Sequence, residues 1–232
     1  ILTRVAEAYR RIRNTLRFLL ANLVDYRPAE HAMPVGEWVE IDRYALELTR
    51  RWQDELVAAY DRYEFHVVVH KLQTFCSEDL GGFYLDVLKD RLYTSAAGAP
   101  ARRSAQNALW HITASMLRLM APILAFTADE AWKVFAGAAD DNVLFHTWHR
   151  FPEQSGADAL VGRWTRIRAV RAEALKELER AREAKAIGAP LQAELDLDAA
   201  GDDHAVLAAL GDDLKFVFIT SQARVHHGDG AL

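Results

Sequence analysis

The arginines of residues 3–22 have the type and spacing best suited to bind an anion. Four polar side chains follow one side of this segment: Arg10, Arg13, Asn14 and Arg17. In a helix, which turns about 100° per residue, they lie within about a third of a turn of one another. A guanidinium group is planar, always charged and shaped to bind phosphate, so this row is typical of a helix that lies along a nucleic-acid backbone. The alternative is a solvent-facing basic surface with local ion pairs, such as one between Glu7 and Arg11.

A second basic segment covers residues 161–185. It carries a net charge of +4, as residues 1–27 do, whereas residues 28–160 carry −7 and residues 186–232 carry −6, within an overall charge of −5. Two basic segments in an otherwise acidic chain indicate a directed contact with an anion rather than a generally basic protein.

Other chemistry has less support in the sequence. His66 and His70 are four residues apart and can face one metal ion, but no third ligand and no metalloprotease glutamate accompanies them. Asp129 and Glu130 are neighbours that point about 100° apart in a helix, so they do not form an acid/base pair. Together with Thr127 they instead predict a capping box, with the hydroxyl at the cap and the glutamate three residues later. Because glycine-rich phosphate loops and G-x-S-x-G motifs are also missing, we expect no catalytic residue, metal site or cofactor in this chain.

The composition is that of an ordinary soluble globular protein, with 51% apolar and 26% charged residues. The lone Cys76 excludes an internal disulfide and a cysteine-based zinc site, favours a reducing compartment such as the cytoplasm, and is expected to be a small buried side chain. No apolar run approaches the roughly 20 residues of a membrane span. The chain opens on Ile1 without a leader pattern, so we expect that it begins inside a larger protein.

Apolar spacing predicts a mainly α protein. We expect an antiparallel helical bundle over residues 1–152, a linker at 154–156, and a basic helix plus a small α+β unit over 153–232. The predicted helices cover 3–22, 39–61, 65–79, 83–93, 101–120, a segment capped at Thr127 and ending near Phe135, 160–186 and 203–210. Gly81 and Gly82 are expected to interrupt or kink the helix around them. The predicted strands are 191–197, 215–220 and 223–227.

Residues 9–23, Y-R-R-I-R-N-T-L-R-F-L-L-A-N-L, resemble bacterial isoleucyl-tRNA synthetases, class I aminoacyl-tRNA synthetases, just after their catalytic domain. The resemblance continues in order through Y-E-F-H at 63–66, F-Y-L-D-V-L-K-D-R-L-Y-T at 83–94, A-R-R-S at 101–104, M-A-P-I-L-A-F-T-A-D-E-A-W at 120–132, I-G-A-P-L-Q-A at 187–193 and F-V-F-I-T-S at 216–221. The motif P-I-L-x-F-x-x-D-E is shared with valyl- and leucyl-type relatives, whereas F-Y-L-D-V-L-K-D-R is more particular to the isoleucyl type.

The resemblance implies an anticodon-binding helical bundle followed by a small junction unit. A full enzyme of this family joins isoleucine to its tRNA with ATP and Mg and hydrolyses misactivated valine. This chain lacks the family's two ATP-binding signatures, the editing domain and the cysteine-rich zinc module found at the C-terminus of many members. It is therefore expected to bind tRNA for isoleucine, to contact its own catalytic domain, to be monomeric and to have no activity alone.

The basic helices and this resemblance together define the candidate RNA-binding residues. Arg10, Arg13 and Arg17 would neutralise phosphates, and Asn14 and Thr15 would hydrogen-bond to the backbone or sugar. Further phosphate candidates are Arg102, Arg103, Arg163, Arg166, Arg168 and Arg171. Reading single-stranded bases requires aromatic or guanidinium planes on which they stack. The candidate platforms are Trp148, Trp164, His146 and His149.

Two alternatives remain at this stage. In the first, the fragment is mainly a scaffold whose basic row packs against the catalytic domain, and other modules hold the tRNA. In the second, it is the equivalent bundle of a valyl- or leucyl-type synthetase.

Overall fold

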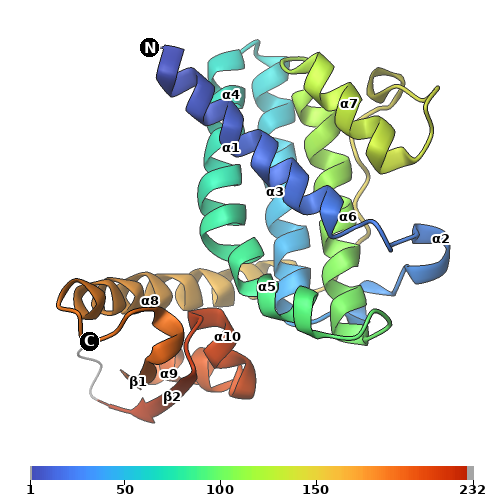
Figure 1. Cartoon of the computed structure of the whole chain (residues 1–232). Coiled ribbons are helices and arrows are strands. Elements are labelled where there is room, and N and C mark those ends of the chain that lie inside the picture. The colour runs from blue at the N-terminus through green and yellow to red at the C-terminus, as the bar shows by residue number, and fades with distance from the viewer. Residues whose placement is uncertain (1, 229–232) are drawn as a thin grey trace. The chain divides into compact units, whose positions relative to one another are not determined.

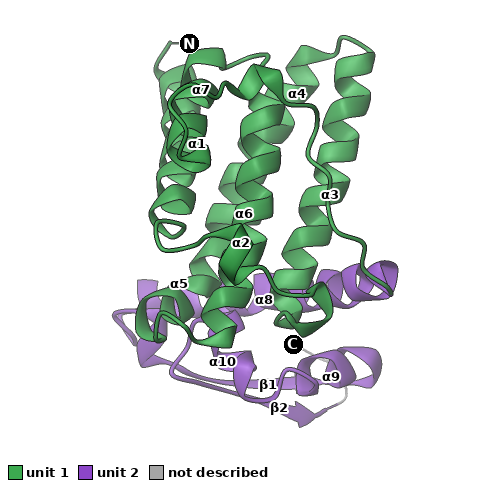
Figure 2. Cartoon of the chain, turned by 90° about the vertical axis from the view of Figure 1, so that its right-hand side faces the viewer, with its two compact units in different colours: residues 1–155 green, residues 156–232 purple. Residues whose placement is uncertain are grey.

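A computed structural model describes residues 2–228 of the chain. They form two compact units, 1–155 and 156–232, shown in separate colours in Figure 2. The predicted domains, 1–152 and 153–232, are a different kind of division from these compact units, and they stay a prediction. The fold class is confirmed: the described residues are mainly α-helical, with one small sheet in the second unit. No helix of the described part is long and apolar enough to cross a membrane.

The first unit is built from helices of very different length. They are α1 (Leu2–Ala21), α2 (Pro28–His31), α3 (Glu40–Asp61), α4 (Phe65–Thr74), α5 (Leu85–Thr94), α6 (Pro100–Met120) and α7 (Ala125–Ala136), with short 3₁₀ turns at Val35–Glu37 and Val143–Phe145. Figure 1 shows α1 running obliquely over the helices behind it, and its residues contact α4, α6 and α7. One long side of α1 is therefore left without a protein partner inside this unit.

Helix α6 provides the centre of the bundle, as its apolar spacing predicts. Leu109, Ile112, Met116 and Leu119 are completely buried. Each side chain of this size that leaves water stabilises the fold by roughly 1.5–3 kcal/mol. The short side chains of α6, such as Ala105 and Ala108, are also fully buried and allow neighbouring helices to approach closely.

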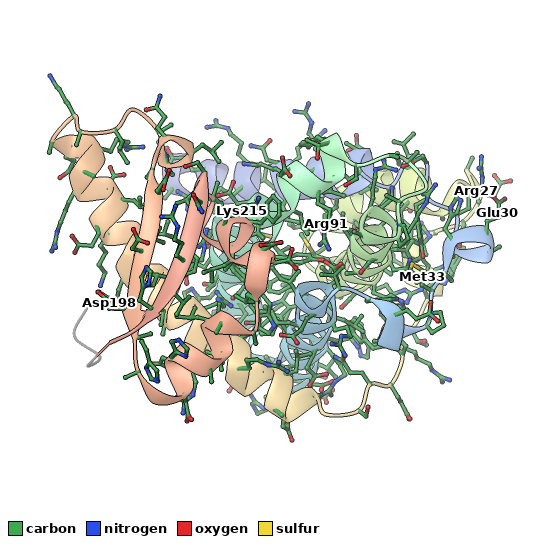
Figure 3. All side chains as sticks on the ribbon, turned by 90° about the horizontal axis from the view of Figure 1, so that it is seen from below. Arg27, Glu30, Met33, Arg91, Asp198 and Lys215 are labelled. Carbon is green, nitrogen blue, oxygen red and sulfur yellow. The ribbon has the colours of Figure 1, made fainter. Side chains whose placement is uncertain are left out.

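A buried polar network ties α3, α5 and α6 together. The carboxylate of Asp42, which has no exposed surface, accepts hydrogen bonds from Tyr84 at 2.8 Å, Arg91 at 2.6 Å and Ser104. Figure 3 labels Arg91 at this position. A buried carboxylate needs such partners, because an unpaired charge in the interior is very costly.

The glycine pair at 81–82 widens a helix instead of breaking it. Between α4 and α5 the chain continues as a π-helical segment, Phe75–Tyr84, with no interruption. A Cβ atom on Gly81 would lie 2.9 Å from the carbonyl oxygen of Cys76, so the widened turn depends on the missing side chain. Cys76 itself is buried, as predicted, and burial raises the pKa of its thiol to about 12.

The predicted capping box at Thr127 is wrong. Helix α7 begins three residues earlier than predicted, with Leu124 at the cap position, and has no side-chain cap. Thr127 lies in the first turn, where its Oγ1 is 2.8 Å from Oη of Tyr9 in α1. The hydroxyl serves a tertiary contact, which local spacing cannot reveal. Asp129 pairs with Lys133 of its own helix, at 2.8 Å.

The second unit holds α8 (Ala157–Glu183), β1 (Glu194–Ala199), α9 (Gly201–Ala208), α10 (Leu214–Phe218) and β2 (Gln222–His227). The strands are parallel and pair Leu195 with Ala223 and Leu197 with Val225. The predicted strand at 215–220 is wrong, because Leu214, Val217 and Phe218 are buried at helical spacing in α10. Residue 219 ends this helix with a left-handed backbone. The predicted strand at 191–197 begins later, at 194, because Pro190 starts a 3₁₀ turn.

Candidate nucleic-acid interface

Helix α1 has three distinct sides. Its buried side carries Ile12, Thr15, Leu16 and Leu19 and faces the bundle. A second side faces α7 and carries Tyr9 and Arg13. The third side points away from the protein and carries Arg10, Asn14 and Arg17, all exposed. Residues three or four apart lie close together around a helix, so Arg13 adjoins Arg10 and Arg17, and its contact with Glu130 of α7 is what sets it apart. Thr15, predicted to bond RNA, instead donates to the carbonyl of Arg11 at 3.1 Å.

The structure divides the predicted arginine row. Arg13 donates a hydrogen bond to Oη of Tyr9 at 3.3 Å, and its Nη2 lies 3.6 Å from Oε1 of Glu130 in α7. Within the described chain, Arg10 and Arg17 have no carboxylate within 4.0 Å. The outward side of α1 therefore presents two uncompensated guanidinium groups, while Arg13 is partly neutralised by a neighbour.

A further pair of arginines belongs to the exposed surface of α1 but was not among the predicted ligands. Arg4 and Arg11 lie two turns apart, are exposed, and also lack an ion pair within the described chain. The ion pair between Glu7 and Arg11, an example under the alternative of a solvent-facing surface, does not form within the described chain. We call Arg4, Arg10, Arg11 and Arg17 the α1 basic face. The sequence could have indicated Arg4 and Arg11 as well, because residues seven apart lie on the same side of a helix.

Arg102 and Arg103 of α6 have partners inside the protein. Arg102 donates hydrogen bonds from Nη1 and Nη2 to the two carboxylate oxygens of Asp25, at 2.5 and 3.1 Å. Arg103 donates to the backbone carbonyl of Asp25 at 2.9 Å. The hydrogen bond from Arg102 lowers the pKa of Asp25 to about 2. This pairing fastens the loop after α1 to the start of α6, so we leave both arginines out of the candidate interface.

Among the predicted aromatic platforms, Trp148 is exposed on one face. Its side chain is 37% exposed and stacks on Tyr60, with the ring centres 5.7 Å apart and the planes 17° apart. Tyr63, in the connection after α3, and Phe65, the first residue of α4, extend this surface and are 79% and 49% exposed. Neither residue was among the predicted platforms, although both lie at the junction of two predicted helices, where side chains are often exposed.

The histidines of the same loop are engaged in the protein. His149 is buried, with its Nε2 2.8 Å from Nδ1 of His111 and its Nδ1 2.9 Å from Nη1 of Arg118. Arginine is always a donor, so Nδ1 of His149 accepts and its Nε2–H donates to His111. Burial lowers the pKa of His149 to about 3 and that of His111 to about 4. His146 is exposed but bonded to Asp141 at 2.8 Å.

The candidates on α8 are less accessible than the sequence indicated. Trp164 is only 1% exposed, so its ring offers no surface on which a base can stack. Arg171 is buried and donates from Nε to the carbonyl of Val217 at 2.7 Å. Arg166 lies 3.1 Å from Asp202 and 3.4 Å from Asp203. The remaining two, Arg163 and Arg168, are half-buried and interact within the protein.

No group of three or more metal-ligating side chains occurs in residues 2–228. The structure therefore does not bring His66 and His70 together with a third ligand. What it does bring together is a helix face with four exposed guanidinium groups, which is suited to an extended polyanion.

Comparison with known proteins identifies relatives over nearly the whole chain. A family model described as the anticodon-binding domain of tRNA ligase matches residues 42–197. An isoleucine–tRNA ligase of Thiobacillus denitrificans is 64% identical over 99% of this chain, and one of Paraburkholderia phymatum is 62% identical over 97%. One of Bordetella petrii is 57% identical over 100%. The chain spans only about a quarter of the length of these relatives, 24%, 24% and 25% respectively.

Proposed function

Because the chain belongs to the family of anticodon-binding domains of tRNA ligases, we propose that it binds the anticodon stem–loop of the tRNA for isoleucine. The observation that carries this proposal is the α1 basic face, whose four arginines have no carboxylate partner within the described chain. A protein that uses such groups internally would pair them, as this chain does with Arg102 and Asp25.

The face has dimensions that suit an RNA backbone. A helix rises about 1.5 Å per residue, so Arg10 and Arg17 lie about 10 Å apart along the axis of α1. Two groups at this separation can contact different phosphates of one strand. Each neutralised phosphate releases bound counterions, which drives association and makes it sensitive to salt. Asn14, between them on the same side, supplies a neutral donor and acceptor for sugar or backbone atoms.

Contacts to phosphates position a protein but do not read sequence. Unpaired bases are read when they stack on exposed aromatic rings and present their edges. Trp148 is the predicted platform we retain, because its outer face is exposed while Tyr60 supports the inner face. Trp164 has no exposed ring surface and is not retained.

We further propose that the chain acts as one part of an isoleucine–tRNA ligase in the cytoplasm, as a monomer. In this proposal ATP and Mg bind elsewhere in the polypeptide, zinc binds in a separate module, and the chain has no ligase activity alone. The names and high identity of its relatives support its place in an isoleucine–tRNA ligase.

A second candidate function is that of a scaffold against another domain of the same polypeptide. The observation in its favour is a set of strongly exposed apolar side chains: Leu2 at 85%, Val5 at 61% and Phe126 at 94%. Exposed large apolar side chains that gather in patches mark contact surfaces in many proteins. A scaffold role through these residues does not require the α1 basic face.

Charge reversal on α1 separates the two candidates. Arg10→Glu combined with Arg17→Glu should weaken tRNA binding by the chain more than tenfold, because each change replaces an attraction by a repulsion. The matched control is Lys176→Glu combined with Arg180→Glu, on exposed positions of α8 that already pair with glutamates. An unchanged affinity in the α1 variant would refute RNA binding by this face and favour the scaffold.

A further inference from the structure

A pocket of about 250 Å³ opens between α1 and α4. Arg4, Glu7 and Arg11 line it from α1, and His70, Gln73 and Thr74 line it from α4. One water molecule occupies about 30 Å³ in the liquid, so this volume holds several waters or a larger hydrated group. Seven of the eight lining residues have polar side chains, which favours a polar ligand.

The charges around this pocket favour an anion. Arg4 and Arg11 are both exposed and have no carboxylate within 4.0 Å in the described chain, although Glu7 lies between them on the same wall. Across the pocket, His70 is exposed on α4. Two permanent positive charges thus share one wall with a single negative charge, and the imidazole of His70 supplies a further hydrogen-bonding group on the other wall.

Neutral hydrogen-bonding groups complete the site. The side chains of Gln73 and Thr74 make no hydrogen bond within the described chain, so their donors remain available to a ligand. The hydroxyl of Ser77, at the end of the pocket, differs because it donates to the carbonyls of Gln73 and Thr74. A forked guanidinium together with neutral donors is a common arrangement for holding a phosphate group.

We propose that this pocket binds a phosphate group of the tRNA backbone, an inference that rests on the proposed function. Arg11 follows Arg10 directly and lies about 100° further around α1, so the pocket adjoins the outward side of the helix. A strand held by Arg10 and Arg17 therefore reaches Arg11 and Arg4 when it passes around α1. Glu7 limits the affinity of the pocket for any phosphate that lacks these additional contacts.

The test measures tRNA binding over a salt series for three variants of the chain. Arg4→Gln with Arg11→Gln should reduce the log–log salt slope by about two and weaken binding at least about tenfold, since two phosphate contacts are lost. Glu7→Gln should strengthen binding, because it removes the only carboxylate of the pocket. The matched control is Arg27→Gln with Arg150→Gln, which removes the same charge from two exposed positions outside α1. Figure 3 shows Arg27 on the α2 end of the bundle.

Each outcome decides between the pocket and its alternatives. Equal losses in the pocket variant and the control would overturn the inference and leave only diffuse charge attraction, while binding by the unmodified chain would still uphold the proposed function. If the unmodified chain does not bind tRNA, the proposed function fails, and a titration with inorganic phosphate follows. If phosphate alone shifts the Nε–H resonances of Arg4 and Arg11, the ligand of the pocket is a free phosphorylated molecule and not the RNA backbone.

Discussion

Arg13 of α1 and Glu130 of α7 lie 3.6 Å apart, whereas Arg10, one turn earlier on the same helix, has no carboxylate partner in the described chain. Two arginines of one predicted row thus have different surroundings. Arg13 contributes to the contact between α1 and α7, together with the hydrogen bond between Tyr9 and Thr127. Arg10 is available to a partner outside the unit.

This difference predicts unequal effects from equal substitutions. Arg10→Gln should lower the salt slope of tRNA binding by about one and weaken binding across the salt range, because a phosphate contact is lost. Arg13→Gln removes the same charge but should have a smaller effect on binding. It should lower the free energy of unfolding only slightly, because solvent screens an exposed ion pair. Fluorescence anisotropy with labelled tRNA measures the first effect, and urea denaturation measures the second. Identical binding losses would show that the row acts as one surface after all.

The carboxylate of Asp25 should contribute stability that disappears in acid. The Arg102 hydrogen bond holds the pKa of Asp25 at about 2 in the folded protein, below its ordinary value of 3.8. The contribution is therefore complete above pH 4 and is lost as the pH falls from about 4 to about 2. We expect about 1 kcal/mol, because the side chain is 39% exposed and solvent screens the pair.

Urea denaturation of the unmodified chain and of Asp25→Asn, compared between pH 6 and pH 2, measures this contribution. The difference in unfolding free energy between the two proteins should shrink as the pH falls below 4. Taking the difference removes the contribution of the other carboxylates, which titrate in both proteins. A difference that stays constant over this range would exclude Asp25 as the responsible group.

The buried histidine pair should also make the first unit sensitive to acid, over a higher range. Burial lowers the pKa of His149 to about 3 and that of His111 to about 4, well below the ordinary value of 6.5. Because the unfolded chain binds protons on these groups first, stability should fall as the pH drops from about 6.5 towards 4. Down to pH 4 the loss should be on the order of 3 kcal/mol for each ring, given about 1.4 kcal/mol per pKa unit.

The hydrogen-bond pattern explains why neither ring accepts a proton easily. Nδ1 of His149 accepts from Arg118 and its Nε2–H donates to His111, so protonation of either acceptor atom breaks a bond. His149→Asn should lower stability at pH 7 and flatten its dependence between pH 7 and pH 4. Parallel pH profiles for the variant and the unmodified chain would contradict this explanation.

Gly81→Ala should destabilise the first unit by about 1–2 kcal/mol, although alanine favours helices by roughly 1 kcal/mol over glycine. The added Cβ would lie 2.9 Å from the Cys76 carbonyl oxygen, inside the widened π-helical turn. Gly98→Ala is the matched control, because nothing lies within 4 Å of its added carbon. Thermal unfolding followed by circular dichroism should show a lower melting temperature for the first variant only. A gain in stability at position 81 would mean that the segment returns to a regular α-helix.

Long periodic segments could be predicted from the sequence because many residues agree on one period. The predicted stripe of α6, from Leu109 to Met120, is buried throughout. Short segments could not be predicted in this way, because a stretch of five residues fits the spacing of a strand and that of a helix equally well. Leu214–Phe218 illustrates this: it is a helix between two parallel strands, which need a crossover connection that local spacing does not show.

Helical periodicity was enough to predict which side of a helix a residue lies on, but not which other residues it contacts. The sequence indicated that α1 carries a basic side, but the partner of Arg102 is Asp25, 77 residues away, and that of Arg13 is Glu130. The burial of Trp164 likewise depends on packing around it. Whether an arginine or a tryptophan is free to meet RNA is therefore a tertiary property, decided by residues distant in the sequence.

The central claim, that this chain binds the anticodon stem–loop of tRNA for isoleucine, is tested most directly by a salt-series titration with that tRNA and with tRNA for valine. We predict a log–log slope that corresponds to about three to six displaced counterions, with tighter binding of the isoleucine tRNA at every salt concentration. A steep slope without preference would contradict isoleucine specificity, and no binding at low salt would contradict RNA binding by this chain.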